Sequence, residues 1–409
     1  MRMGGGAVAE PSRRVAITRI VLVALFAVPA VAFRAGGVHL TPVAAMLVFG
    51  IGVVAAAVLL MWAAEVARED ISGALALALL ALIAVLPEYA VDLYFAYQAG
   101  SRPEFAAYAA ANMTGANRLL IGIGWPLVAL VFALAARRRG RPRGPERDVT
   151  LAPHRRVELG FLMIAALFVF VLPLAREIAW YASIVLIAVY LAYLWRVSRG
   201  QAHAEELVGV PARLARLRRA PRRLTTVLLF LGGAIVVFAS AEPFAEGLVE
   251  AGGELGIDRF LLVQWLAPLA SEAPELIVAC VYAWRLRGDD ALGALLSSKV
   301  NQWTLLIGTM PVAYAAGGGG WALPLDHRQV EEVFLTAAQT VLALGVLLDL
   351  RFRWREAIML LVLFAAQFAF PDERIRMILS WLYLVLGVAL LVVRRRDIPP
   401  ALRAVRPGT

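Results

Sequence analysis

Cysteine, lysine and histidine are scarce in this chain of 409 residues, and charged residues are few. The single cysteine, Cys280, excludes a disulfide framework within the chain and any metal site built on cysteines alone. The single lysine is Lys299, so arginine carries nearly all of the positive charge. Charged residues make up only 17% of the sequence and hydrophobic residues 61%, which excludes an ordinary water-soluble protein.

Apolar runs of about the length of a membrane span follow one another along the chain. They lie roughly at 16–36, 42–65, 72–98, 103–136, 157–175, 177–196, 225–250, 258–286, 289–316, 328–349, 355–370 and 375–395. Because about 20 apolar residues cross a bilayer as a helix, these runs predict about twelve transmembrane helices in an all-α polytopic membrane protein. The run 103–136 is long enough for one broken, tilted helix or for two shorter pieces. The first run lacks a convincing cleavage site, so we expect it to be retained as a helix.

The formal net charge of +10 is concentrated in the short segments between these runs. If the N-terminus is cytoplasmic, every strongly basic segment falls on the cytoplasmic side; these are 137–156, 196–223, 351–355 and the tail that begins at Arg394. The pattern predicts a protein of the plasma (inner) membrane with both termini in the cytoplasm. No folded domain is left to present a basic face to nucleic acid. We therefore expect membrane lipid and inorganic cations as partners, and no nucleic acid.

A block of sequence recurs in the two halves of the chain at nearly constant spacing. Leu86-Pro87-Glu88 is followed by Leu119-Leu120-Ile121-Gly122, and Ala273-Pro274-Glu275 is followed by Leu305-Leu306-Ile307-Gly308. The offsets are 275 − 88 = 187 and 305 − 119 = 186 residues. On the span count above, the two blocks cross the membrane in opposite directions. Inverted repeats around a site at the membrane midplane are typical of secondary transporters.

The repeat predicts two inverted five-helix repeats plus extra helices at the ends. The expected boundaries are 1–41 for an N-terminal segment with an extra transmembrane helix, 42–196 for the first repeat with its motif at about 72–124, 197–224 for a basic cytoplasmic linker, 225–370 for the second repeat with its motif at about 258–316, and 371–409 for the last transmembrane helix and a basic cytoplasmic tail.

Six ionisable residues are predicted near the middle of spans, where each charge costs about 2.5–3.5 kcal/mol and needs a reason. They are Glu88, Asp92, Glu272, Glu275, Arg118 and Lys299. The acids form two pairs, spaced four and three residues apart, so each pair shares one helical face. Pro87 and Pro274 stand beside the acids and are expected to break the helices and free backbone carbonyls. Oxygen-rich surroundings favour Ca²⁺ or Na⁺ over zinc or copper.

The two blocks resemble the α-repeats of the Ca²⁺:cation antiporter superfamily, which includes the sodium/calcium exchangers. The resemblance covers about 60–120 and 240–315 and rests on Pro87-Glu88 with the segment 112–117, and on Pro274-Glu275 with the segment 293–302. It implies that Glu88 and Glu275 lie at the centre of the ion site and hold the metal ion. It also implies further ligands from the following helices, namely Asn112, Asn117, Ser298, Asn301 and Gln302.

Two basic residues depart from the superfamily pattern. Lys299 stands where a neutral amide is usual, and Arg118 follows the first motif. A fixed ammonium beside the site can replace a bound cation, or Lys299 can extend to the membrane interface instead. Asp92 and Glu272 are then either ion ligands or salt-bridge partners of these two bases. Four acids and two bases leave 4 − 2 = 2 net negative charges, enough for one Ca²⁺ or two Na⁺.

The leading hypothesis is a secondary active antiporter that exchanges Ca²⁺, or a related cation, for Na⁺ or H⁺ by alternating access. It needs no cofactor besides the transported ions. The alternatives are a Na⁺/H⁺ exchanger that has lost the divalent site, and a non-transporting scaffold. An intramembrane hydrolase is a weaker hypothesis, because no metal cluster and no nucleophile with its base accompany the acids. We therefore expect a protein that is not an enzyme.

Overall fold

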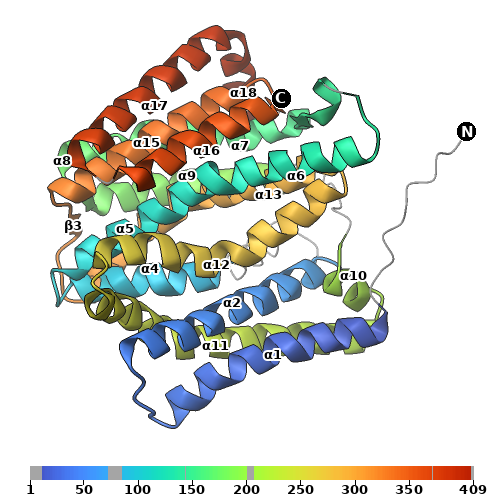
Figure 1. Cartoon of the computed structure of the whole chain (residues 1–409), viewed down its shortest axis with the longest axis vertical. Helices are drawn as coiled ribbons and strands as arrows, with labels where there is room; N and C mark the ends of the chain where they lie inside the picture. The colour runs from blue at the N-terminus through green and yellow to red at the C-terminus, as the bar shows by residue number, and fades with distance from the viewer. Residues whose placement is uncertain (1–11, 72–84, 143, 200–206, 371, 407–409) are drawn as a thin grey trace, which may run out of the picture.

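The computed structural model describes residues 12–71, 85–142, 144–199, 207–370 and 372–406, and helices make up nearly all of them (Figure 1). The helices up to residue 199 are α1 (Arg13–Ala35), α2 (Pro42–Ala67), α4 (Leu86–Ala99), α5 (Phe105–Leu119), α6 (Trp125–Arg138), α7 (Arg156–Val169), α8 (Val171–Ala175) and α9 (Trp180–Ser198). The later ones are α10 (Val210–Ala215), α11 (Arg219–Leu255), α12 (Arg259–Trp284), α13 (Gly288–Asn301), α14 (Ile307–Ala316), α15 (His327–Leu347), α16 (Trp354–Ala369), α17 (Glu373–Val393) and α18 (Ile398–Ala404). The all-α polytopic fold class is confirmed.

Two long helices contain a wider, π-helical turn. Helix α5 continues through η1 (Leu120–Gly124) into α6, and α13 continues through η4 (Gln302–Leu306) into α14. The run 103–136 is therefore one interrupted helix. The first π-turn begins three residues after the segment 112–117, and the second begins at Gln302, the last residue of the segment 293–302. Turns of this kind occur often at functional sites. Short 3₁₀ turns, η2 (Pro145–Arg147), η3 (Pro153–Arg155) and η5 (Arg395–Asp397), lie in connections between helices.

Nine of the described helices are long and apolar enough to cross a membrane. Three of the expected spans are not among these. Residues 72–84, the first part of the expected span 72–98, lie outside the described residues. The helix over 288–316 is not among the nine, and α16 has only 16 residues. The expected number of twelve therefore stays a prediction.

Capping residues explain where several helices begin. The Ser12 hydroxyl accepts a hydrogen bond from the backbone N–H of Val15, and Thr41 does the same for Ala44 at the start of α2. At the start of α15, Asp326 Oδ1 accepts from the backbone N–H of Gln329 at 2.8 Å, and the Gln329 side chain accepts from the backbone N–H of Asp326 at 3.2 Å. This capping box fixes the first turn of α15.

Two short antiparallel strand pairs join connections that are far apart in the sequence. Strand β1 (Val149–Thr150) pairs with β4 (Arg351–Phe352), and β2 (Glu177–Ala179) pairs with β3 (Ala322–Pro324). We call the end of the bundle with β1 and β4 the basic end, and the end with β2 and β3 the opposite end. The two basic segments 137–156 and 351–355 thus meet at one end, as the charge pattern predicts. Which end faces the cytoplasm stays a prediction.

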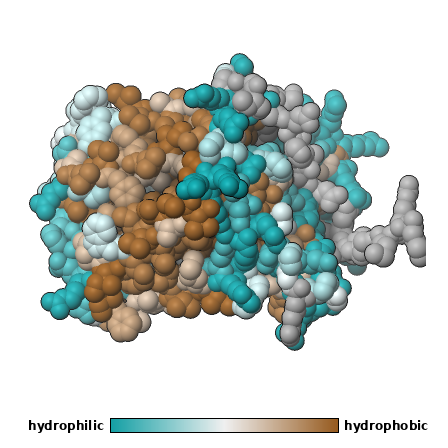
Figure 2. Space-filling view, turned by 90° about the horizontal axis from the view of Figure 1, so that it is seen from above, coloured by the Kyte–Doolittle hydropathy of each residue, from teal (hydrophilic) through white to brown (hydrophobic). Residues whose placement is uncertain are grey.

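The helices form a layered bundle in which the two motif helices lie in the middle. In Figure 1, α1, α2 and α11 pack together on one side, α15, α16 and α17 lie on the other, and α4, α5, α12 and α13 lie between them. Figure 2 shows a broad hydrophobic band between hydrophilic ends, the surface expected of a protein embedded in lipid. Large apolar side chains such as Phe238 and Leu167 are 71% and 70% exposed, as expected of side chains that face lipid.

Candidate ion-binding site

Helix α4 carries the two acids of the first motif into the centre of the bundle. Pro87 lies in its first turn, where a missing N–H costs nothing. Glu88 and Asp92 follow one turn apart, and both are buried. Because Asp92 is fully enclosed, its charge has to be compensated by a neighbouring group, a bound cation or a proton.

Helix α12 carries the two acids of the second motif. Glu272 is 2% exposed, whereas Glu275, one turn later, is only partly buried. The helix runs without interruption from Arg259 to Trp284, although Pro268 and Pro274 lie inside it. The expectation that Pro274 breaks the helix is wrong. A proline removes one hydrogen bond, and the packing around α12 keeps the remaining bonds formed.

The amide of Gln302, in the π-turn η4, joins an acid of one motif to an acid of the other. Its Nε2 donates to Glu88 Oε1 at 2.9 Å and to Glu272 Oε1 at 2.6 Å. The preceding residue makes a second link, because Tyr89 Oη donates to Asn301 Oδ1 at 2.9 Å. The structure therefore brings together Glu88, Glu272, Asn301 and Gln302 from both halves of the chain.

Lys299 lies deep inside the protein and beside the acids. Its Nζ donates to the backbone oxygen of Asn117 at 2.8 Å and to Asn117 Oδ1 at 2.7 Å, and it lies 4.9 Å from the centre of the Trp303 ring. The side chain is fully buried, so the alternative in which it reaches the membrane interface is wrong. The Lys299 ammonium interacts electrostatically with Glu272 and Glu88.

Arg118 is buried as well, but it turns away from the four acids. Its guanidinium pairs with Glu332 on α15 at 2.6 Å, donates to Gln367 Oε1 at 3.2 Å and lies 4.9 Å from the Trp265 ring. The alternative in which Arg118 neutralises Asp92 or Glu272 is wrong. Only Lys299 remains beside the acids, so the charge count becomes 4 − 1 = 3 net negative charges if all four are ionised.

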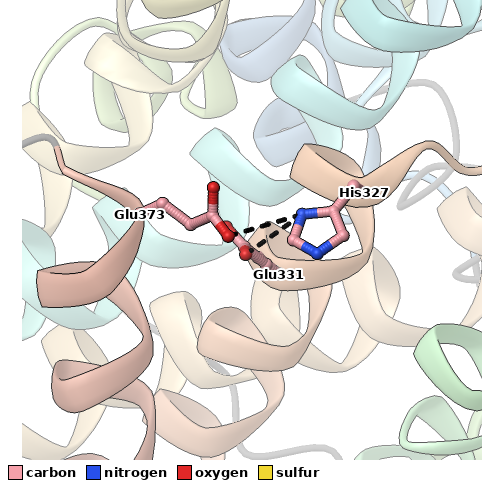
Figure 3. Close-up of side chains that lie close together, drawn as sticks. All are labelled: His327, Glu331 and Glu373. Atoms are coloured by element: carbon pink, nitrogen blue, oxygen red, sulfur yellow. Dashed lines mark ion pairs between the residues drawn. The ribbon is translucent and has the colours of Figure 1, made fainter.

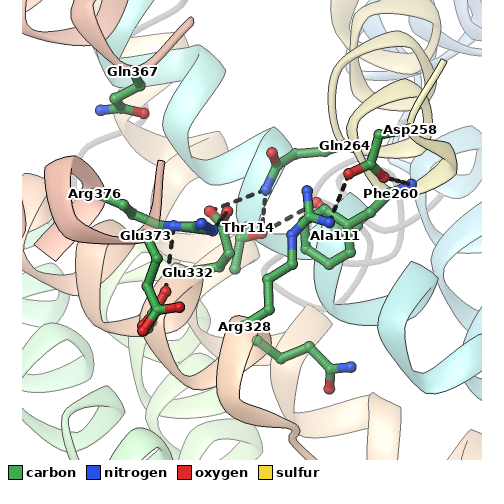
Figure 4. Close-up of polar contacts among 12 residues, drawn as sticks. Ala111, Thr114, Asp258, Phe260, Gln264, Arg328, Glu332, Gln367, Glu373 and Arg376 are labelled. Atoms are coloured by element: carbon green, nitrogen blue, oxygen red, sulfur yellow. Dashed lines mark hydrogen bonds and ion pairs between the residues drawn. The ribbon is translucent and has the colours of Figure 1, made fainter. Parts of the chain in front are cut away.

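Glu332 belongs to a polar network that the sequence reading missed. Figure 4 shows Arg376 and Gln264 directed at this carboxylate, at 3.0 Å from Nη1 and 3.2 Å from Nε2. Gln264 Nε2 also donates to Thr114 Oγ1 at 3.3 Å, which ties α12 to α5. The signal was present in the sequence, because Glu331 and Glu332 lie at the start of an otherwise apolar run.

Several buried oxygens around the acids accept no hydrogen bond of normal length and angle from the described residues. They are both carboxylate oxygens of Asp92, Glu272 Oε2, Gln302 Oε1 and Asn112 Oδ1. Asn112 lies beside Asp92, and Ser298 lies beside Glu275. Buried polar atoms without partners are rare in proteins. Carboxylate and amide oxygens are the ligands that a hard cation such as Ca²⁺ prefers, so these oxygens fit such an ion.

Like Asn301, whose Oδ1 accepts from Tyr89, Asn117 is a candidate ligand whose side-chain oxygen is already in use. Its Oδ1 accepts from Lys299, and its Nδ2 donates to the backbone oxygen of Met113 at 2.9 Å. The ammonium of Lys299 thus lies against an oxygen that the resemblance assigns to an ion. Among the described residues, the buried oxygens without a partner near the acids belong instead to Asp92, Glu272, Asn112 and Gln302.

Comparison with known proteins gives one consistent result. Residues 41–199 and 225–371 match the family described as sodium/calcium exchanger protein. A crystal structure of the H⁺/Ca²⁺ exchanger CAX is 43% identical, with 95% of this chain and 97% of that chain covered and a TM-score of 0.88.

Two more distant solved structures share the fold. Native YfkE is 14% identical over 91% of this chain and 98% of its own, with a TM-score of 0.59. The sodium-calcium exchanger NCX_Mj is 19% identical over 80% of this chain and 98% of its own, with a TM-score of 0.52. A putative antiporter, CaxA of Alkalimonas amylolytica, is 29% identical over 97 residues; the match spans 23% of this chain and 30% of that relative.

Proposed function

The chain belongs to the sodium/calcium exchanger protein family, a family of membrane transporters and not of enzymes, and on this premise we propose that it exchanges Ca²⁺ for H⁺ across the membrane. The observation that carries the proposal is the cluster of acids from both halves of the chain around Gln302. In secondary transporters with inverted repeats, a site between the repeats is open to alternate sides of the membrane.

We assign the cation to Glu88, Asp92 and Glu272, with Asn112 as a neutral ligand. Asp92, Glu272 and Asn112 offer buried oxygens without hydrogen-bond partners in the described part of the chain. Glu88 is joined to Glu272 through Gln302, and the helices of these residues belong to both halves. Glu275 is more exposed than the other three acids, and Ser298 lies beside it. We place Glu275 at the mouth of the site, where an ion loses its first waters.

Protons are the coupling ion that the charge count favours. Three net negative charges exceed the charge of one Ca²⁺ and cannot stay uncompensated in a low-dielectric interior. Carboxyl groups that give up Ca²⁺ can take protons in its place, whereas a bound Na⁺ needs several oxygen ligands of its own. The two oxygens of Asn117 are suited to a monovalent cation such as Na⁺. The ammonium of Lys299 already occupies the position beside them. The similarity to the H⁺/Ca²⁺ exchanger CAX also favours H⁺ and Ca²⁺ as the two exchanged ions.

Substitution of the bridged acids tests the site. We expect Glu88→Gln and Glu272→Gln each to reduce Ca²⁺ uptake into proteoliposomes by about 100-fold or more, because loss of a charged ligand to a desolvated ion costs at least about 3 kcal/mol. The matched control is Glu104→Gln, which changes an exposed carboxylate next to the start of α5.

The control should transport at the wild-type rate, and all three variants should reach the membrane in equal amounts. Full uptake by Glu88→Gln or Glu272→Gln in correctly inserted protein would refute the assignment of the ion to these residues.

A further inference from the structure

A second cluster of metal-ligating side chains lies at the opposite end of the bundle, where α15 and α17 begin. Figure 3 shows His327, Glu331 and Glu373 directed at one another. His327 Nδ1 lies 3.2 Å from Glu331 Oε1 and 3.8 Å from Glu373 Oε1. One ligand atom from each of the three residues lies within 4.8 Å of the others. Neither the proposed transport site nor the sequence motifs use these residues.

The cluster opens into a cavity that an ion can enter from the surface. The cavity has a volume of about 500 Å³ and is also lined by Arg374, Met377, Ile378 and Trp381. His327 and Glu373 are 66% and 68% exposed, whereas Glu331 is 5% exposed at its side chain. One ligand is therefore fixed in the protein, and two can adjust their rotamers around an ion.

We propose that His327, Glu331 and Glu373 form a binding site for a borderline divalent cation of the Zn²⁺ type, distinct from the transported ion. Imidazole nitrogen and carboxylate oxygen are both donors that zinc uses, and a site with three protein ligands leaves a fourth position for water. Ca²⁺ takes six to eight oxygen ligands and gains little from an imidazole. The site should therefore select Zn²⁺ against Ca²⁺.

The surrounding structure holds the ligands in place. The capping box of Asp326 and Gln329 fixes the turn that carries His327, and residues four apart on a helix share one face. Arg376 lies 3.4 Å from Glu331 Oε2, the oxygen that does not face His327, and pairs also with Glu332. Arg376 thus orients Glu331, while its charge and that of Arg374 limit the affinity for a cation.

A bound ion would join α15 to α17 at a place next to Glu332. That residue pairs with Arg118, which follows Asn117 on the motif helix α5. We therefore expect Zn²⁺ to raise the thermal stability of the folded protein, because a ligand that binds only the folded state stabilises it.

Zn²⁺ binding to the purified full chain, without a histidine tag, tests the proposal. Affinity is measured by competition with a chromogenic chelator, and thermal stability is measured with and without Zn²⁺. We expect His327→Ala and Glu373→Gln each to weaken binding roughly tenfold or more. Both side chains are exposed, so neither change should prevent folding.

The matched control is His39→Ala, which removes an exposed histidine from the connection between α1 and α2 at the same end. This control should bind Zn²⁺ like the wild type, and a large excess of Ca²⁺ should not displace the ion. Zn²⁺ affinity and stabilisation that are unchanged in His327→Ala and Glu373→Gln would overturn the proposal. Transport of Ca²⁺ is not needed for this test, so its outcome is independent of the proposed exchange.

Discussion

At the scale of single residues, the neutral amide of Gln302 is what allows two acids to approach each other. An amide nitrogen carries two hydrogens, and here one is donated to Glu88 and the other to Glu272. A lysine in that place would neutralise the acids, whereas an amide orients them and leaves their charge available to an ion. The fixed positive charge is supplied nearby by Lys299, which is held by Asn117.

Lys299→Asn tests the role of this charge. Removing the ammonium leaves a place against Asn117 that Na⁺ can take, and the site gains one net negative charge. We expect the wild-type protein to take up Ca²⁺ independently of Na⁺, and the variant to respond to Na⁺ with a change of about tenfold in half-saturating Ca²⁺, or ~1.4 kcal/mol. The measurement is ⁴⁵Ca²⁺ uptake at varied Na⁺.

Lys299→Arg, which keeps the charge, is the control and should remain independent of Na⁺. Identical Na⁺ profiles for Lys299→Asn and the wild type would show that the ammonium does not stand in for a cation.

The sequence predicted which residues belong to the candidate site, but not which of these side chains contact one another. The proline-acid blocks and the amides after them identified Glu88, Glu272 and Gln302 as candidates. The sequence could not show that Gln302 bridges Glu88 to Glu272, because that depends on how two helices from different halves are rotated. The sequence also could not show that Arg118 pairs with Glu332, because the two residues are more than 200 positions apart in the chain.

At the scale of elements, the site depends on a close crossing of α5 and α12. Gly115 makes this possible, because a Cβ at this position would lie 1.7 Å from the backbone oxygen of Gln264. The same contact places Thr114 against the Gln264 side chain. Any side chain at residue 115 would push apart the helices that carry Asn112 and Glu272.

Gly115→Ala is therefore expected to destabilise the protein by about 1–3 kcal/mol through overpacking, and to lower its melting temperature. The control is Gly232→Ala on α11, where an added Cβ meets nothing within 4 Å. That change should be neutral or stabilising by up to about 1 kcal/mol, because alanine favours a helix. Thermal unfolding in detergent measures both, and equal melting temperatures would contradict the close crossing.

An ion pair joins the connection after α2 to the start of α11, and its acid, Asp70, lies outside the candidate membrane spans. Asp70 accepts hydrogen bonds from Arg222 at 2.7 and 2.8 Å, and this bonding, together with that from Arg223, lowers the pKa of Asp70 to about 2. A lowered pKa in the folded state means that the pair stabilises the protein above the ordinary pKa of aspartate. This contribution is lost as the pH falls from about 4 towards 2.

Asp70→Asn should accordingly lower the melting temperature at neutral pH, and the difference from the wild type should shrink as the pH falls below about 4. The exposed Asp372, at the start of α17, provides the control Asp372→Asn. A melting-temperature difference for Asp70→Asn that is constant from pH 7 to pH 3 would contradict the linkage.

Element boundaries were largely predictable because apolar length marks a span. The expected run 42–65 corresponds to α2 (Pro42–Ala67), and 375–395 corresponds to α17 (Glu373–Val393). The predicted run 225–250 is shorter than the helix that the structure shows, α11 (Arg219–Leu255). The helix extends into the arginine-rich linker, because arginine also favours a helix although it is not apolar. The two π-turns had no signal in the hydrophobic pattern, since a single wider turn hardly alters periodicity.

At the scale of the whole molecule, both halves of the chain contribute side chains to the central acidic cluster. The motif helices α4 and α12 bring the acids, and the interrupted helices that follow them bring the amides. The long helices α1, α2 and α11 pack on one side of this centre, and α15, α16 and α17 on the other (Figure 1). A central site between two repeats is typical of secondary transporters.

The central claim is that this cluster exchanges Ca²⁺ for H⁺, and flux in proteoliposomes tests it most directly. Purified protein is reconstituted, a proton gradient directed outwards or a Na⁺ gradient directed outwards is imposed in separate runs, and ⁴⁵Ca²⁺ uptake is recorded together with internal pH. The account predicts Ca²⁺ uptake driven by the proton gradient, with internal pH rising as protons leave, and none driven by Na⁺ alone. Changes of internal pH that depend on Na⁺, without any movement of Ca²⁺, would contradict it.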